Sequence, residues 1–306
     1  MERKMKNLKQ TNSRMLRGIS KSARFFIADS TELVKEAQKL HNLDPIAITL
    51  FGKLLTATAM MGQDLKGDKD VLTLRFNGDG AYGILLSTAK HNGQVKGYIG
   101  NTEKVIDINK KDSLGNIDFI GNGTFQVIKD MGLKDPFVGL INISSSDIAN
   151  NIANYFFTSE QIKSVVSLGV KLNEKGEVEK AGGFIIQLLP NVEDSFIDKI
   201  ENKLKNIKSI TDLLDGGFNL ERIVKLIYED MSDEENEKLV EEYQILEESH
   251  LEYKCDCSRE RFLSGLMTLG RDEIEELLET QGKIEVECHF CMKKYDYYEE
   301  DFKNYL

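Results

Sequence analysis

The stretch VLTLRFNGDGAYGILLSTAKHNGQVKGYIG, residues 71–100, decides the fold class. From Val71 onward, apolar and polar side chains alternate with a period of two, which is typical of a half-buried strand. Asn77-Gly78-Asp79-Gly80 and His91-Asn92-Gly93 are turn sequences that reverse the chain between successive runs. The stretch therefore predicts an antiparallel meander with strands at Val71–Phe76, Gly83–Ser87 and Val95–Ile99.

Helices precede this meander, and a mixture of elements follows it. Amphipathic spacing predicts a helix over Thr31–Leu43, and Asp44-Pro45 supplies an N-cap and an N1 proline for an apolar helix, Pro45–Met61. Because Lys53 interrupts the second helix and its length is short for a bilayer span, we expect a buried core helix. The order of elements predicts an α+β body, an antiparallel sheet with packed helices, that ends near Pro190. Its later elements are predicted strands at Val138–Ile143, Val165–Leu172 and Phe184–Leu189 and a helix at Asp147–Phe157.

The sequence after Pro190 has a mostly helical pattern. Apolar residues at helical spacing predict one helix over 196–214 and a second over 220–227. An acidic run, 229–248, follows at the position expected of a linker. We therefore predict three parts: an α+β body at 1–193, a helical and acidic linker at 194–250, and a small C-terminal unit at 251–306.

Charge and composition limit the possible function classes. The chain has 306 residues and a formal net charge of −11, which argues against a nucleic-acid binder, since such a protein needs a basic footprint. Residues 1–24 are basic, but no apolar signal-peptide core follows them. We therefore expect a cytoplasmic protein without a membrane span. The basic run and the acidic run are each expected to be solvated surface.

All four cysteines lie near the C-terminal end in two close pairs, Cys255-Asp256-Cys257 and Cys288-His289-Phe290-Cys291. Two such pairs around a small foldable insert build a tetrahedral thiolate site, because each pair supplies two ligands from one tight turn. The insert has helical spacing in two stretches that stop at Gly270 and Gly282. We predict one Zn²⁺ per chain, held by Cys255, Cys257, Cys288 and Cys291.

The alternatives for these cysteines are unpaired structural thiols, constitutive disulfides and a metal site that includes His289. The pairing argues against the first, and a reducing cytosol argues against the second. Four thiolates already complete a tetrahedral shell, so we expect His289 to be a bystander. A disulfide within the CxC pair would be strained, and strained disulfides are labile, so the site can exchange metal for disulfides under oxidants. A structural zinc contributes ~10–16 kcal/mol and a core this small at most ~3–5 kcal/mol, so metal loss should unfold the unit.

Two glycine patterns resemble nucleotide sites but lack the required context. Gly78–Gly83 fits GxGxxG but precedes a strand-like segment rather than a helix, and Gly62–Gly67 lacks the Lys-Ser/Thr of a P-loop. We therefore expect no ATP site. One rival function is a thiol oxidoreductase that uses Cys288 and Cys291, for which a helix should begin at the pair. Another is a zinc-ribbon module for nucleic acid or a regulator, against which the acidic charge argues.

The cysteine motif and several body segments together resemble one known family. Cys255-Asp256-Cys257-Ser258-Arg259-Glu260-Arg261 followed by Cys288-His289-Phe290-Cys291 resembles the redox-regulated 33 kDa chaperonin family of bacterial heat-shock holdases. The similarity runs from about residue 15 to the end, and the basic segment 1–13 lies outside it and is given no role. Similar body segments are Thr31-Glu32-Leu33-Val34, Leu65-Lys66-Gly67-Asp68, Gly97-Tyr98, Val127-Ile128-Lys129-Asp130, Thr158-Ser159-Glu160-Gln161 and Ala181-Gly182-Gly183-Phe184-Ile185-Ile186-Gln187-Leu188-Leu189-Pro190.

The resemblance implies a stress-response chaperone rather than an enzyme, an ATP-independent holdase whose reduced, zinc-bound form is inactive. Peroxide with heat, or hypochlorite, then closes the disulfides Cys255–Cys257 and Cys288–Cys291, expels zinc, and unfolds the C-terminal unit and then the linker. The implied partners are unfolding client proteins, a second copy in an oxidised homodimer, and ATP-dependent foldase chaperones that later take the clients. Residues 1–193 would be the chaperone core and 251–306 the redox switch.

Overall fold

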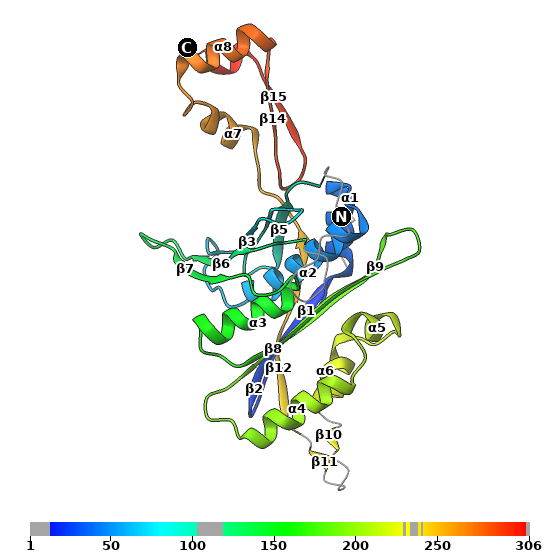
Figure 1. The fold of residues 1–306 in the computed structure, drawn as a ribbon. Coiled ribbons are helices and arrows are strands. Elements are labelled where there is room, and N and C mark those ends of the chain that lie inside the picture. Colours follow the sequence, from blue (N-terminus) through cyan, green and yellow to red (C-terminus); the bar gives the residue numbers. More distant parts are fainter. Residues whose placement is uncertain (1–12, 103–118, 229–230, 233–237, 240, 304–306) are drawn as a thin grey trace, which may run out of the picture. The chain divides into compact units, whose positions relative to one another are not determined.

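The computed structural model describes residues 13–102, 119–228, 231–232, 238–239 and 241–303. The chain divides into two compact units, Met1–Tyr253 and Lys254–Leu306, each with its own apolar core. The larger unit combines two antiparallel-rich sheets with packed helices (Figure 1). The predicted α+β class is therefore confirmed.

A five-stranded sheet joins strands from distant parts of the larger unit. Neighbouring strands are antiparallel throughout, in the order β12-β1-β2-β9-β8. In β2, Phe26 faces one core cluster, whereas Phe25 and Ile27 face another. Strands buried on both faces lack the alternation of a half-buried strand, so the sequence pattern predicts neither β1 nor β2. The bounds are β1 Arg14–Ser20, β2 Ala23–Asp29, β8 Ser164–Leu172, β9 Val178–Leu188 and β12 Tyr243–His250.

The predicted meander forms the centre of a six-stranded sheet. Its three strands are β3 (Val71–Gly78), β4 (Ile84–Ala89) and β5 (Gln94–Ile99), paired antiparallel in sequence order. On the far side of β3 lie β6 (Gly123–Asp130), which the sequence pattern does not predict, and β7 (Phe137–Asn142), which it does. The sheet is completed by the short β13 (Glu252–Tyr253), which pairs parallel with β5. Its order is β13-β5-β4-β3-β6-β7.

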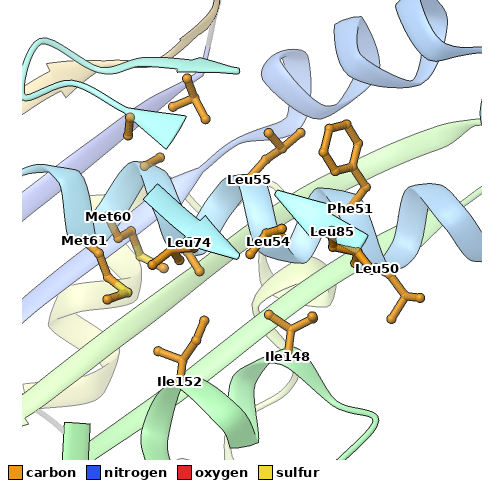
Figure 2. Packing of buried hydrophobic residues seen from close by; sticks show 14 of the residues in the cluster. Leu50, Phe51, Leu54, Leu55, Met60, Met61, Leu74, Leu85, Ile148 and Ile152 are labelled. Atoms are coloured by element: carbon orange, nitrogen blue, oxygen red, sulfur yellow. The ribbon is translucent and has the colours of Figure 1, made fainter. Parts of the chain in front are cut away.

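Helix α2 (Pro45–Gly62) is the central core helix, as the sequence predicts. The Asp44 carboxylate accepts hydrogen bonds from the backbone of Ile46 and Ala47 at 2.8 and 3.0 Å, which makes it the expected N-cap. The helix is long and apolar enough to cross a membrane, but 78% of that stretch is buried inside the protein. Figure 2 shows side chains of α2 packed among those of the six-stranded sheet and of α3 (Ile148–Ser159). Helix α1 (Thr31–His41) packs beside α2.

Helix α2 packs against one face of the five-stranded sheet, at β8 and β9. Three helices cover the opposite face: α4 (Asp194–Asn206), α5 (Ile210–Asp215) and α6 (Leu220–Tyr228). On α6, Ile223 and Val224 are 0% and 1% exposed. They belong to one apolar cluster with the sheet residues, and the ring of Phe25 lies 5.4 Å from that of Tyr228. The segment predicted as a linker therefore contains helices that bury an apolar sheet face. The sheet residues under them are Leu16, Phe25, Ile27, Phe184 and Ile186.

The single helix predicted over 196–214 is wrong, because the structure has two helices there, α4 and α5. The chain leaves helical geometry at Ile207, whose backbone is extended, and a new helix begins after Ser209. The Ser209 hydroxyl accepts a hydrogen bond from the backbone of Asp212 at 3.2 Å. Serine competes for backbone hydrogen bonds and is favoured as an N-cap, which explains a break inside an otherwise continuous apolar period.

The described parts of the basic and acidic runs pair with each other, while Glu247 and Glu248 remain exposed at the surface, as expected. Strand β12, from the acidic run, pairs antiparallel with β1, from the basic run. The Arg14 guanidinium donates to both carboxylate oxygens of Glu221 at 2.8 Å and to Glu248 at 2.9 Å, and Arg17 pairs with Glu247 at 2.8 Å. The opposite charges of the run that begins the predicted body and the run in the predicted linker could have indicated this contact.

Arg14 joins three elements, β1, α6 and β12, so its replacement should loosen them together. Its hydrogen bond holds the pKa of Glu221 below the usual value. A lowered carboxylate pKa contributes stability above the unfolded-state pKa, and the contribution is lost as pH falls through the folded value. We expect Arg14→Gln to lower the free energy of unfolding by ~1 kcal/mol at pH 7, because these charges are partly solvated.

The expected loss should shrink once the pH falls below the unfolded-state glutamate pKa of about 4.3. Chemical denaturation at pH 7 and at acid pH measures it. Lys208→Gln, at an exposed position between α4 and α5, is the control. A loss of equal size at both pH values would contradict an ionic role for Arg14.

Candidate metal centre

The C-terminal unit is a small scaffold around the four cysteines. It contains α7 (Arg259–Leu266), α8 (Arg271–Gln281) and a hairpin of β14 (Ile284–Glu287) with β15 (Lys294–Tyr297) (Figure 1). The two helices and β14 confirm the predicted folded insert. A core of this size contributes at most ~3–5 kcal/mol to folding. Its buried apolar residues in the described part of the unit are Ile274, Ile284, Tyr295, Tyr297 and Phe302.

The second cysteine pair lies in the turn of the β14–β15 hairpin. Cys288 follows β14 directly, and its carbonyl accepts hydrogen bonds from the backbone of Cys291 and Met292 at 3.2 and 2.7 Å. Met292 has a φ of 56°, in the left-handed region, which lets the chain reverse tightly before β15. Cys288 is 3% exposed. This turn brings the thiols of Cys288 and Cys291 into the same cluster.

The first pair lies in the segment without regular secondary structure that joins β13 to α7. Ser258, next to Cys257, caps that helix, since its hydroxyl accepts a hydrogen bond from the backbone of Arg261 at 3.2 Å. Cys255 and Cys257 are half-buried, whereas Asp256 between them is exposed. The two pairs are thus presented by different local structures.

The structure brings all four predicted ligand residues together. Their Sγ atoms lie within 4.8 Å of one another. The distance from Cys255 to Cys288 is 3.7 Å, and that from Cys257 to Cys291 is 3.4 Å. Four thiolates about 2.3 Å from a metal in tetrahedral geometry are separated by ~3.8 Å. The donor set and its spacing therefore fit one tetrahedral metal ion.

The electrostatics of the cluster favour a bound cation. Burial raises the pKa of Cys255 well above the usual thiol value and raises that of Cys291 to about 11. At Cys257 burial acts in the same direction, but hydrogen bonds from Tyr295 and the other thiols outweigh it and lower the pKa. Four thiolates at this range repel one another, and metal ligation requires deprotonated thiols. A divalent cation supplies the charge that lets all four ionise.

Two further residues contact the cluster or its scaffold, and neither has a role in the sequence-based prediction. The Tyr295 hydroxyl, on β15, lies 3.2 Å from Cys257 Sγ, and this contact is the chief reason that its own pKa is raised. Arg259 stacks 4.4 Å from the centre of the Tyr297 ring and pairs with Asp301 at 2.6 Å. Arg259 belongs to the CDCSRER motif, which was a usable signal, whereas Tyr295 depends on the unpredicted β15.

The structure also shows where His289, the CxxC pair and the Gly78–Gly83 pattern lie, which bears on the alternative functions. His289 is exposed and is not part of the four-residue group that could hold a metal among the described residues. Strand β15, rather than a helix, follows Cys291, so the CxxC pair lacks the helix N-terminus of a thiol oxidoreductase. Gly78–Gly83 is the turn between β3 and β4, which confirms a hairpin rather than a dinucleotide loop.

The fold and the site together define a class of protein: an α+β body followed by a separate small unit with a cluster of four thiols that could hold a metal ion. Comparison with known proteins makes the class specific. The sequence profile of the family described as "Hsp33 protein" matches residues 13–298. The chain therefore belongs to the Hsp33 family of chaperones.

Individual relatives agree with this assignment over nearly the whole chain. A 33 kDa chaperonin of Thermoanaerobacter sp. (strain X514) is 41% identical over 91% of this chain and 92% of its own length. One from Clostridium perfringens (strain SM101 / Type A) is 40% identical over 96% of this chain and 92% of its own. The crystal structure of the 33 kDa chaperonin from Thermotoga maritima, 30% identical, covers 95% of this chain and 97% of its own, with a TM-score of 0.81.

Proposed function

We propose that the protein is a cytoplasmic, redox-regulated holdase, which binds unfolding proteins without ATP and prevents their aggregation under oxidative and heat stress. The observation that carries this proposal is the gathering of four thiols in a unit whose apolar core is very small. In the reduced form Cys255, Cys257, Cys288 and Cys291 hold one Zn²⁺, which supplies most of the free energy that folds the unit. No catalytic residue is proposed, since the protein converts no substrate.

The surface hidden in the inactive form is, in this proposal, the sheet face under α4, α5 and α6. Phe25 and Phe184 are 2% and 8% exposed there. Exposed apolar faces of this kind attract the apolar segments of unfolding proteins. Detachment of the helices would uncover the face and leave the other core cluster, around α2, in place.

The chain itself connects the C-terminal unit to helices α4, α5 and α6, which together form the α4–α6 cover of the sheet. The C-terminal unit begins at Lys254, directly after β13, and β12 lies just before β13. Unfolding that begins at Cys255 would pull first on these two edge strands. Loss of β12 would remove Glu248 from Arg14, the residue that also holds Glu221 of α6. The proposed division into core 1–193, linker 194–250 and switch 251–306 describes this order of release.

The proposed partners are unfolding client proteins, a second copy of the chain once it is oxidised, and ATP-dependent foldases that receive the clients after reduction. A decisive test treats the reduced protein with peroxide at heat-shock temperature. Zinc release and suppression of aggregation of a thermally unfolding client are measured on the same sample. We expect about one zinc per chain to leave as protection appears, and reductant to reverse both. Protection without any bound metal in the reduced protein would refute the proposal.

Oxidation should join neighbouring cysteines, Cys255 with Cys257 and Cys288 with Cys291. The family resemblance and the closeness of each pair in sequence support this pairing, although the 3.4 and 3.7 Å thiol contacts run between pairs. Those contacts are opposite edges of the metal tetrahedron, and metal loss frees each loop to close on itself. Peptide mapping of the oxidised protein checks the pairing, and mainly cross-pair bonds would overturn it.

A further inference from the structure

Strand β7 is an open edge of the six-stranded sheet. It pairs with β6 on one side, and no described strand pairs with its other side. Phe137, Val138 and Leu140 on β7 are 49%, 51% and 53% exposed, and Met131 and Leu133 in the preceding turn are 45% and 67% exposed. Figure 1 shows the β6–β7 hairpin projecting from the rest of its sheet. Exposed large apolar side chains therefore gather on this hairpin.

The other edges of the two large sheets are protected, and β7 is not. Natural proteins blunt sheet edges with charged residues or with very short strands, because an open edge recruits other chains. Glu247 and Glu248 lie on the edge strand β12, and β13 is only two residues long. β8 carries a single charge, Lys171, but its residues are half-buried along the whole strand, and α3 and α5 pack against it. β7 has the sequence FVGLIN, without a charge. An uncharged edge kept beside three protected ones indicates that β7 is used for binding.

The inner side of β7 holds the strand firmly in place. A Cβ at Gly139 would lie 2.6 Å from the Tyr155 ring of α3, so this position faces the helix at close range. Ile141, on the same face of the strand, packs against the main core cluster. Val138 and Leu140 point to the opposite side. The strand therefore presents a fixed backbone edge and an outward apolar face, rather than a loose loop.

The chemistry of this edge selects its occupant. Unpaired backbone N–H and C=O groups are satisfied by another extended segment, and the absence of charge favours an apolar one. A second copy is disfavoured, because each chain has a net charge of −11 and a contact one strand wide and ~20 Å long is small beside the ~1,200–2,000 Å² of a stable interface. An extended segment of an unfolding protein needs only transient contact.

We propose that β7 takes extended, uncharged apolar segments of unfolding proteins by strand addition, in the reduced as well as the oxidised form. This inference rests on the proposed holdase function and names a contact surface for its clients. β7 contains no cysteine and does not belong to the sheet face under α4–α6. It thus provides a weak first contact with the client. The face uncovered on oxidation binds the same client at a second place, and the two contacts together give the higher affinity.

The test uses the full-length, reduced, zinc-loaded protein and a fluorescein-labelled peptide of alternating valine and threonine, with fluorescence anisotropy as the readout. We expect weak, saturable binding that Val138→Lys or Leu140→Lys reduces by about tenfold. Leu246→Lys is the matched control, because Leu246 is 53% exposed on the charged edge β12. It should leave the affinity unchanged. Circular dichroism confirms that each variant is folded.

Three outcomes would overturn the inference. The first is equal binding by Val138→Lys and the unchanged protein, and the second is equal binding of a fully N-methylated peptide, which cannot form a ladder. The third is a concentration-dependent dimer of the reduced protein that Val138→Lys dissociates, since the occupant is then a second copy. The peptide assay needs neither oxidant nor an aggregating client. An oxidised protein that protects clients while β7 binds no peptide refutes only this inference.

Discussion

Replacement of Cys288 by serine is expected to empty the metal site and to produce client protection without any oxidant. Cys288 is the most buried of the four thiols, at 3% exposed, and its backbone anchors the hairpin turn that positions Cys291. A serine hydroxyl does not replace a thiolate as a zinc ligand at neutral pH. The variant should therefore contain well under one zinc per chain, against about one in the unchanged reduced protein.

The consequence for folding follows from the size of the free energies. A structural zinc contributes ~10–16 kcal/mol, whereas the small apolar core of the unit contributes at most ~3–5 kcal/mol. Loss of the metal thus leaves residues after Tyr253 largely unfolded. The α4–α6 cover keeps its own contacts, and a few kcal/mol of remaining docking energy holds the open form at a few per cent. Mild heat should then complete the opening, because the open state has the higher conformational entropy.

Light scattering of an aggregating client, with both proteins reduced, measures this effect at ambient and heat-shock temperature. His289→Ala is the control, since His289 is exposed beside Cys288 and is expected to leave the zinc in place. A catalytic cysteine, by contrast, would lose activity on replacement. If the zinc-poor variant protected no better than the unchanged reduced protein at either temperature, the unfolding switch would be wrong.

Local sequence patterns were sufficient to predict some helices and strands and not others. The meander, α1, α2, α3, α6 and the zinc-unit helices follow from periodicity, turns and caps, because their signals lie within a few neighbouring residues. β1 and β2 were not predicted, because burial on both faces removes the alternation of apolar and polar residues, as at Phe25, Phe26 and Ile27. β12 was not predicted because its acidic residues indicated a solvated linker. It is a strand because its backbone pairs with β1, which is far away in sequence and also supplies Arg14 and Arg17 as partners for its glutamates.

The candidate site was easier to predict than the fold around it. Two cysteine pairs specify a four-thiol cluster whatever the scaffold, because metal geometry constrains the ligands directly. The contact of Tyr295 with Cys257 depends on β15, and that of Arg259 depends on Asp301, and only folding of the unit brings these partners together. The open edge at β7 was also beyond sequence reasoning. Its alternation predicts a strand, but only sheet order reveals which strand lacks a second neighbour.

A charge placed under the α4–α6 cover should activate the protein while zinc stays bound. Ile223 is 0% exposed on α6, in the apolar cluster that joins this helix to the five-stranded sheet. Ile223→Asp removes a buried side chain worth ~2–5 kcal/mol and adds a carboxylate that would require several more to bury unpaired. Since α6 can leave the sheet to solvate this charge, we expect the cover to detach and the separate cluster around α2 to remain folded.

The variant therefore tests the effect of detaching the α4–α6 cover independently of metal loss. We expect Ile223→Asp to suppress client aggregation without oxidant, at heat-shock temperature and in part below it, while metal analysis still finds about one zinc per chain. Lys208→Gln changes the net charge equally at an exposed position between α4 and α5 and should stay inactive until oxidised. Hydrogen exchange should speed up in α4 to α6 and stay slow in β3 and β6. A zinc-loaded Ile223→Asp protein with an exposed sheet face and no protection would show that this face does not bind clients.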